Sequence, residues 1–203
     1  MNTSSRIAQK ILEMVGNGLW GFKPNLMHHI VTQHGASASL AWFVKNMPTY
    51  EKILKQWGPI RTHLLATEIS VLNGCPYCTY GHVYALELHY FKATGQLLPD
   101  DEAEITAWHG LSEDEAIEKF RQLINSSELV SELPFFERTL LLRQDKVQPE
   151  TEDDAKIVHL LQMFSFLNQC GINGKTDRDQ AHDPINKDML LRNEYGQLRQ
   201  KSA

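Results

Sequence analysis

Residues 72–82 read Leu-Asn-Gly-Cys-Pro-Tyr-Cys-Thr-Tyr-Gly-His, and this stretch joins two segments that both show helical spacing of apolar residues. Its Asn-Gly dipeptide is typical of a turn that ends a helix. Pro76 suits the first position of the next helix, because its ring fixes φ and that position needs no backbone N–H. Cys75 is then the N-cap residue, and Cys78 lies in the first turn of the new helix.

Apolar side chains recur at helical spacing along most of the chain, whereas the strict alternation of apolar and polar residues that marks a strand is nearly absent. Two such stripes are Ile7, Ile11, Met14 and Val15, and Ile157, Leu160, Leu161, Phe164 and Leu167. The pattern predicts an all-α fold, a single-domain helical bundle of roughly eight to ten helices.

Capping residues indicate where several of these helices begin and end. Ser112 and Glu115 have the spacing of a capping box at a helix N-terminus. Gly95 and Gly171 are each expected just after the last residue of a helix, where glycine is common. Pro48 is expected to mark another boundary, because proline disrupts a helix interior.

The chain length of 203 residues is that of one domain or slightly more. We expect a single all-helical domain over residues 1–203, with its core at about residues 59–170. Residues 171–203 are polar and begin with a charged non-helical stretch that ends at Pro184. This C-terminal arm is expected to be either a solvated appendage or a clasp on a neighbouring subunit.

Charge and composition exclude several classes of partner. The chain has 20 Lys and Arg against 25 Asp and Glu, a net charge of −5, which argues against bulk electrostatic binding of nucleic acid or an anionic membrane. No apolar run approaches the ~18 residues of a membrane span, and no secretory signal pattern is present. We therefore expect a cytoplasmic protein. Motifs for nucleotide cofactors are absent, so no cofactor is expected.

Cys75 and Cys78 combine features that favour redox chemistry. Both sulfurs lie near the unpaired amides of a helix N-terminus, which favour thiolate over thiol. The two residues are three apart and are able to close a disulfide. His82 follows Cys78 by one helical turn and is suited to exchange the thiol proton. Glu68, on the preceding helix, has a carboxylate that suits holding the imidazole or relaying a proton.

Two other interpretations of the cysteines compete with the redox one. Cys75, Cys78 and His82 would supply three ligands of a structural zinc site, with Cys170 or another histidine as the fourth. No second Cys-x-x-Cys and no His-x-x-x-His offers a natural partner, so we expect no metal. The pair would otherwise be buried structural cysteines, as we expect for the lone Cys170.

The run Glu68…Asn-Gly-Cys75-x-x-Cys78-x-x-x-His82, set between helical flanks, resembles the alkylhydroperoxidase D-like group of the carboxymuconolactone decarboxylase superfamily. Residues 164–168, Phe-Ser-Phe-Leu-Asn, resemble the aromatic and Asn segment that packs near the site in that family. The resemblance covers about residues 59–168. It implies an all-α fold, assembly into trimers or hexamers, and thiol-dependent reduction of organic hydroperoxides.

The resemblance also implies a role for each member of the motif. Cys78 would attack the peroxide, Cys75 would resolve the product as a disulfide, and His82 would relay protons. Oxidised enzyme would be reduced by a dithiol protein, either thioredoxin-like or lipoyl-bearing.

One position departs from the family pattern. The relay glutamate of the family often stands twelve residues before the first cysteine, where this chain has His63, while Glu68 stands seven before it. Five residues along one helix turn the side-chain direction by about 140°, so the two side chains point to different places. Three possibilities follow: the relay is rearranged around Glu68, His63 serves in it, or the relay is weakened. Tyr77 and Tyr80 are candidate residues of the pocket wall.

Two further functions remain as alternatives. Cys-Pro-Tyr-Cys is also the active-site tetrapeptide of glutaredoxins, which would make the chain a general thiol–disulfide oxidoreductase. That fold needs a strand before the motif, whereas residues 60–72 have helical spacing. The other alternative is a non-catalytic redox or zinc-bound structural module.

Overall fold

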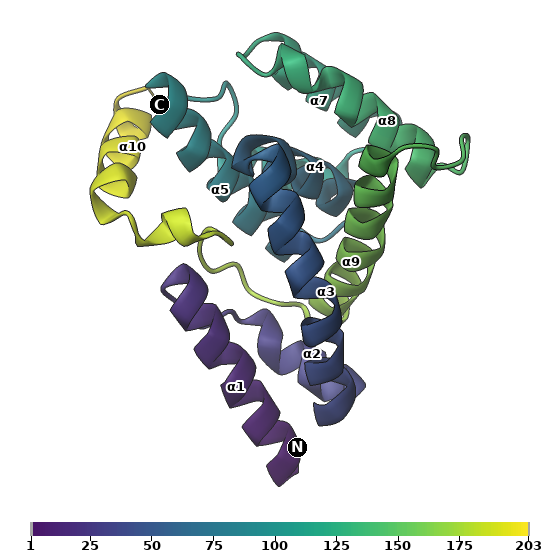
Figure 1. The fold of residues 1–203 in the computed structure, drawn as a ribbon. Helices are drawn as coiled ribbons and strands as arrows, with labels where there is room; N and C mark the ends of the chain where they lie inside the picture. Colours follow the sequence, from purple (N-terminus) through teal and green to yellow (C-terminus); the bar gives the residue numbers. More distant parts are fainter. Residues whose placement is uncertain (1, 203) are drawn as a thin grey trace.

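The computed structural model describes residues 2–202, and this part of the chain consists of helices and loops without a strand (Figure 1). The α-helices are α1 (Thr3–Trp20), α2 (Leu26–His34), α3 (Ala36–Trp57), α4 (Pro59–Leu72), α5 (Pro76–Thr94), α6 (Glu102–Ala107), α7 (Glu113–Asn125), α8 (Leu133–Arg143), α9 (Glu152–Gly174) and α10 (Met189–Ser202). Three 3₁₀ turns are η1 (Trp108–Gly110), η2 (Val130–Glu132) and η3 (Pro184–Lys187). The predicted all-α fold is confirmed. Among the described helices, none has both the length and the apolarity needed to cross a membrane.

Helices α4 and α5 form the centre of the bundle, with α3 and α9 packed against them, α1 and α2 at one end, and α7 and α8 at the other (Figure 1). Residues 62–71 of α4 are all buried, so this helix is covered on every side. The first apolar cluster contains Cys75 and Cys78 and joins α4 to α1–α3 and α9. The second apolar cluster joins the other side of α4 and α5 to α6–α8.

Two of the predicted helix boundaries are confirmed. Ser112 caps α7, and the side chain of Glu115 accepts a hydrogen bond from the Ser112 backbone N–H, which completes the capping box. Gly95 ends α5 with a φ of 71°, in the left-handed region that glycine adopts at little cost.

Two other predicted boundaries are wrong. Pro48 lies inside α3, which continues to Trp57. The missing N–H of Pro48 affects the carbonyl of Val44, and Val44 lies on the exposed face of the helix, where water can take the place of the lost donor. Gly171 lies inside α9, which ends three residues later and is capped by Lys175 with a φ of 47°.

The apolar stripe on α1 is helical, as its spacing predicts, but it does not face the core. The exposed α1 stripe comprises Ile7, Ile11, Met14 and Val15. The buried face of the helix carries mostly small residues: Ser5, Ala8, Leu12 and Gly16. Gly16 is required there, because a Cβ at this position would lie 2.4 Å from a ring carbon of Pro24.

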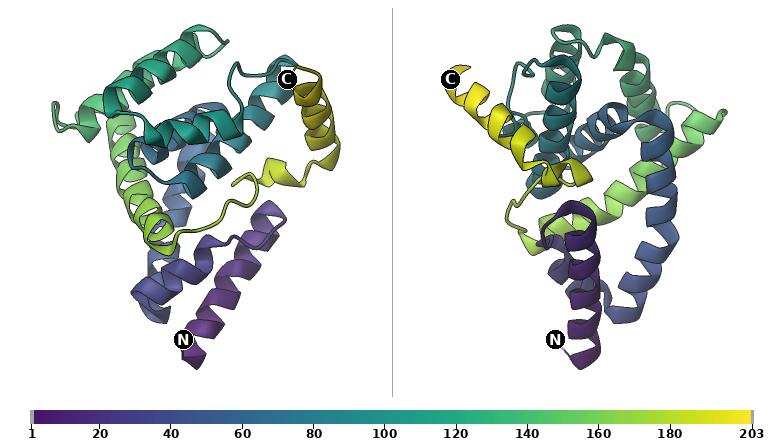
Figure 2. Two further views of the ribbon diagram at one scale, coloured as in Figure 1. Left: turned by 180° about the vertical axis from the view of Figure 1, so that it is seen from behind. Right: turned by 60° about the vertical axis from the view of Figure 1, so that its left-hand side comes forward.

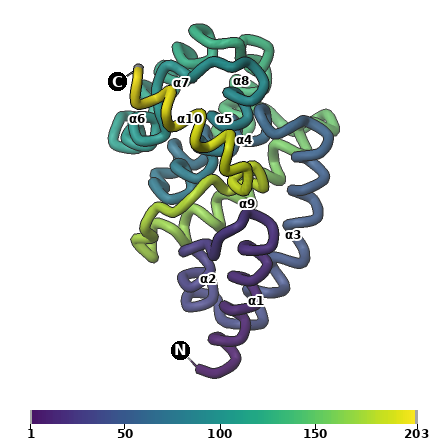
Figure 3. Tube along the Cα trace, turned by 90° about the vertical axis from the view of Figure 1, so that its left-hand side faces the viewer, coloured from purple at the N-terminus to yellow at the C-terminus, as the bar shows by residue number. Residues whose placement is uncertain are grey.

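The C-terminal arm is not a solvated appendage, which corrects that part of the prediction. Figures 2 and 3 show the segment after α9 running back over the bundle, and η3 lies against both α1 and α5. Ala181, His182 and Asp183 are buried along this path. The apolar members of the arm pack against α5 in a third cluster, so the arm is part of the hydrophobic core of its own chain.

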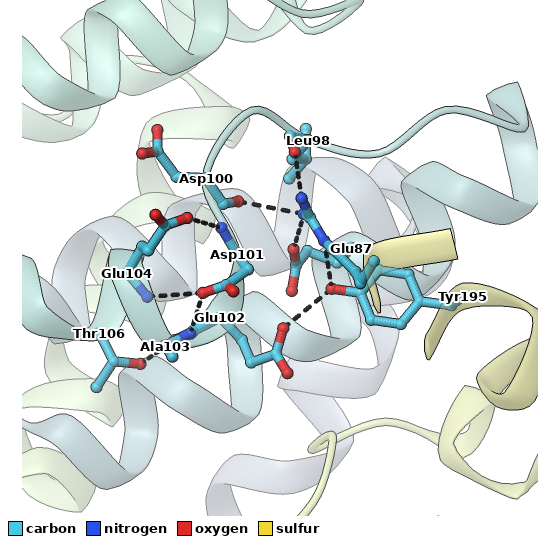
Figure 4. Close-up of polar contacts among 10 residues, drawn as sticks. Glu87, Leu98, Asp100, Asp101, Glu102, Ala103, Glu104, Thr106 and Tyr195 are labelled. Atoms are coloured by element: carbon cyan, nitrogen blue, oxygen red, sulfur yellow. Dashed lines mark hydrogen bonds and ion pairs between the residues drawn. The ribbon is translucent and has the colours of Figure 1, made fainter. Parts of the chain in front are cut away.

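A buried ion pair fastens α10 to the bundle (Figure 4). Arg199 binds Glu87 of α5, whose side chain is fully buried, and it donates to the carbonyl of Leu98 at 2.8 Å. The hydroxyl of Tyr195 donates to Glu102 of α6 at 2.9 Å. Burial raises the pKa of Glu87 and the Arg199 charge opposes that shift, so the carboxylate depends on its arginine partner.

Replacing Arg199 with methionine should reduce the free energy of unfolding by about 3 kcal/mol, because it leaves the buried Glu87 carboxyl without its charged partner. Lys92→Met is the matched control, since Lys92 pairs with Asp188 at the surface and such pairs contribute less than about 1 kcal/mol. Urea unfolding measures both. Equal losses in the two variants would contradict the structural role of the Arg199 pair.

Candidate active site

The two motif cysteines lie where α4 turns into α5. Gly74 has a φ of 73° at this turn, and the Cys75 backbone N–H donates to the Ser70 carbonyl at 3.0 Å. Cys75 is the N-cap of α5, and its Sγ accepts the backbone N–H of Cys78 at 3.4 Å. The predicted N-cap position of Cys75 and the start of α5 at Pro76 are both confirmed.

Both thiols are free and buried beneath α9. Gly171 lies directly over them, since a Cβ at this position would be 2.8 Å from Cys75 Sγ and 3.9 Å from Cys78 Sγ. This close approach, rather than a helix end, is the reason for glycine at position 171. Cys170 is buried beside them with its Sγ 3.4 Å from His34 Nε2, and burial raises the pKa of its thiol to about 11.

The two motif thiols have opposite acidities. A hydrogen bond from the Cys78 thiol, together with the backbone N–H groups of Cys78 and Tyr77, lowers the pKa of Cys75 despite burial. Burial, and then the hydrogen bond to Cys75, raises the pKa of Cys78 well above its usual value. In this pair the Cys78 thiol is therefore the hydrogen-bond donor and the more acidic Cys75 sulfur is the acceptor.

A chain of hydrogen bonds leads away from His82, the candidate base. Its Nδ1 lies 3.1 Å from Nδ1 of His63, and His63 Nε2 lies 3.0 Å from Oδ2 of Asp183. The other oxygen of Asp183 lies 2.9 Å from Nε2 of His89. Burial would raise the pKa of Asp183, but hydrogen bonds from the two histidines outweigh it and hold the pKa well below the usual range.

This chain fixes the tautomer of each histidine. A carboxylate only accepts, so His63 donates through Nε2–H and its Nδ1 becomes an acceptor. His82 must then donate through Nδ1–H, which leaves its Nε2 as a lone-pair acceptor. Burial lowers the pKa of His63, and it lowers that of His82 further. His82 is therefore a neutral imidazole with a free basic nitrogen.

The C-terminal arm supplies part of this site, which the sequence reasoning missed. The His182 ring packs so closely on α5 that a Cβ at Gly81 would lie 2.3 Å from it, and the His182 backbone N–H donates to the Gly81 carbonyl at 2.9 Å. Asp179 accepts from the Tyr77 hydroxyl at 2.8 Å and from His182 Nε2 at 3.0 Å. Tyr77 is thus held in the wall of the site, as predicted.

An enclosed cavity of about 40 Å³ brings these groups to one space. Cys78 and His82 both line it, together with Tyr77 and His182. The remaining wall is apolar or aromatic and comprises Trp20, Leu26, Met27, Phe43, Met47, Tyr50, Met163, Phe164 and Leu167. Since a single water needs about 10–15 Å³ by this measure, the cavity has room for a small polar group with at most a short apolar extension.

The segment over residues 164–168 packs near the site, as the resemblance implied. The Phe164 ring meets the His82 ring edge-on, with centroids 4.7 Å apart. Asn168 accepts from the Ser70 hydroxyl at 3.3 Å, beside the turn that carries Cys75.

Glu68 faces away from this chain of histidines. It shares a helix face with Leu64 and Val71, which pack in the second apolar cluster, whereas the thiols belong to the first. Both carboxylate oxygens are buried without a hydrogen-bond partner, and the charges that act on them are those of Arg143 and Glu137 on α8. Of the two candidates for the relay, the structure brings His63, not Glu68, against His82.

Tyr80 also lies outside the cavity. Its ring contacts Tyr84, and the guanidinium of Arg178 lies 5.6 Å from its centroid.

Among the described residues, the cysteines do not gather with His82 into a group of three close ligand atoms. The geometry thus gives no support to a zinc site built on the motif.

Comparisons with known proteins found no relative of this chain: no family model, no curated protein and no solved structure matches it.

Glu68→Gln should stabilise the protein at neutral pH. Burial raises the pKa of Glu68 well above 4.5, so above that pH the unfolded chain releases this proton while the folded chain keeps it, and stability falls as pH rises. The neutral amide removes this loss, so the variant should gain stability at pH 7 and gain none at pH 4. Urea unfolding at both pH values measures it. A variant less stable than wild type at pH 7 would contradict an unpartnered carboxyl.

Proposed function

We propose that the protein is a thiol peroxidase that reduces organic hydroperoxides through a dithiol–disulfide cycle of Cys78 and Cys75. One observation carries the proposal: Cys78 and the neutral imidazole of His82 line the same cavity. Hydrogen bonds connect this imidazole through His63 to Asp183. The resemblance of the motif to alkylhydroperoxidase D-like proteins points to the same chemistry.

Cys78 is the sulfur that attacks, because it lines the cavity whereas Cys75 is fully buried behind it. The raised pKa of Cys78 and the lowered pKa of His82 keep both groups neutral at rest, so the Cys78 proton passes to His82, directly or through a water in the cavity, as the sulfur attacks. The thiolate attacks the outer peroxide oxygen, the O–O bond breaks, and Cys78 becomes a sulfenic acid. The departing alkoxide receives the proton held by His82 and leaves as an alcohol. The histidine chain supports the transient charge on His82 through Asp183.

Cys75 completes the cycle. Its thiolate attacks the sulfur of the Cys78 sulfenic acid, forms the disulfide and releases water after one proton is added. The lowered pKa of Cys75 suits this step. A dithiol protein, thioredoxin-like or lipoyl-bearing, then returns two electrons and two protons.

The cavity indicates a small substrate. Its volume of about 40 Å³ accommodates the peroxide group and a short alkyl chain, and its aromatic and aliphatic wall favours an organic hydroperoxide. The glutaredoxin fold is excluded, because the segment before the motif is α4 and not a strand.

We also propose that the chain forms a homo-oligomer, a trimer or hexamer, in the cytoplasm. The exposed α1 stripe supports self-association, since large apolar side chains in a row commonly mark an interface. A reducing compartment would keep the three thiols free.

Cys78→Ser should abolish the reduction of a small alkyl hydroperoxide, since the attacking sulfur is lost. Cys170→Ser is the control and should keep the wild-type rate. Mass mapping of peroxide-treated wild type should find a Cys75–Cys78 disulfide. Normal peroxide consumption by Cys78→Ser would refute the proposed mechanism.

Asp183→Asn should lower kcat/KM by about 100-fold or more, because the amide no longer dictates the tautomers of His63 and His82. Glu68→Gln is the discriminating partner variant and should retain the wild-type rate, because Glu68 faces the second apolar cluster. The opposite outcome, a loss in Glu68→Gln alone, would place the relay on Glu68. Circular dichroism and thermal unfolding establish that both variants are folded.

A further inference from the structure

One group of side chains among the described residues has the composition and spacing of a metal site. One ligand atom from each of His63, His89 and Asp183 lies within 4.8 Å of the other two. His63 and Asp183 are buried, and the side chain of His89 is 19% exposed. The three residues come from α4, α5 and the C-terminal arm, so only the folded chain brings them together.

The spacing of the ligand atoms suits a tetrahedral ion. Ligands at roughly 2.0–2.1 Å from a zinc ion lie about 3.3 Å from one another. The carboxylate oxygens of Asp183 lie 3.0 Å from His63 Nε2 and 2.9 Å from His89 Nε2. Nε2 of both rings contacts the same carboxylate, and because the rings are stacked within 15° of parallel they must rotate to direct both Nε2 lone pairs at one ion. Small side-chain shifts would therefore admit an ion between the three groups.

The donor set limits which ions would bind. Two imidazoles and one carboxylate are the protein ligands of several zinc sites with an open fourth position, and divalent transition metals prefer such mixed nitrogen and oxygen ligands. His89 also lines a surface hollow of about 470 Å³ formed with Trp57, Gly58 and Lys92, among others. Through this hollow His89 reaches solvent, from which an ion and a water as its fourth ligand would come.

We propose that His63, His89 and Asp183 form a binding site for a divalent transition ion of the Zn²⁺ class. An ion on His63 Nε2 displaces the proton from that nitrogen to Nδ1. His63 then donates to His82 Nδ1, and the His82 proton moves to Nε2. His82 no longer accepts the thiol proton. This consequence rests on the proposed peroxidase function: the ion switches the base off.

Metal binding is tested with Zn²⁺ on the reduced, metal-stripped full chain by equilibrium dialysis. Wild type should bind about one ion per chain. His89→Gln should bind it about 100-fold more weakly or worse, while its amide N–H still donates to Asp183 and preserves the fold. His28→Gln is the matched control and should bind as wild type. Absence of binding to wild type, or equal binding by His89→Gln, would overturn the proposal.

A second experiment distinguishes binding at this site from binding at the thiols. Cys75→Ser/Cys78→Ser should bind Zn²⁺ as wild type does, and bound Co²⁺ should show tetrahedral absorption without a thiolate charge-transfer band. Loss of binding in the double serine variant would assign the ion to the cysteines and overturn the proposal.

Inhibition of peroxide reduction by Zn²⁺ is measured separately from Zn²⁺ binding. Zn²⁺ should slow peroxide reduction in wild type and leave the rate of His89→Gln at its own metal-free value. If the chain binds Zn²⁺ through His89 but reduces no peroxide, the proposed function fails and the metal site stands.

Discussion

The buried carboxylate of Asp183 is the constraint on which the site depends. A charge removed from water must be compensated by hydrogen bonds, and Asp183 accepts them from His63, His89 and the backbone N–H of Ile185. These donors come from α4, α5 and the arm itself, so the carboxylate is satisfied only when the arm lies across the bundle. The contact that closes the fold is therefore the same contact that orders the histidines. Because carboxylate accepts at both oxygens, the direction of every hydrogen bond from Asp183 to His82 is determined.

The two thiols differ in acidity and in their access to the cavity. Cys75 caps α5 and accepts amide N–H groups, which lowers the pKa of its thiol at a fully buried position outside the cavity wall. Cys78 keeps its proton but lines the cavity, and His82, one turn further along α5, lines it too. Gly171 allows α9 to cover both sulfurs and enclose the space. The site thus separates the acidic thiol from the accessible one and gives the accessible one a neutral base.

Local signals in the sequence were sufficient to predict where the residues of the cysteine motif lie. The Asn-Gly turn, the proline at the first helical position and the three-residue spacing place Cys75, Cys78 and His82 correctly, because all of them act within one turn of chain. The rest of the site depends on contacts across the fold: Asp183 meets a histidine 120 residues earlier. The segment that carries Asp183 is rich in charged residues, and that composition predicts a solvent-exposed position. Helical geometry showed that Glu68 and His63 point apart, but only packing beside Leu64 and Val71 shows that Glu68 faces the second apolar cluster. Gly171 was misjudged for the same reason, since spacing reveals a helix but not which of its positions another element approaches closely.

The central claim is that Asp183 sets the tautomers of His63 and His82, and two-bond ¹H–¹⁵N NMR spectra of the imidazole rings test it most directly. In the reduced, metal-free protein at neutral pH, His63 should be neutral with its proton on Nε2, and His82 neutral with its proton on Nδ1. A neutral His82 protonated on Nε2, or a pair of histidines that both carry charge, would contradict the account, because neither leaves a lone pair on Nε2 of His82.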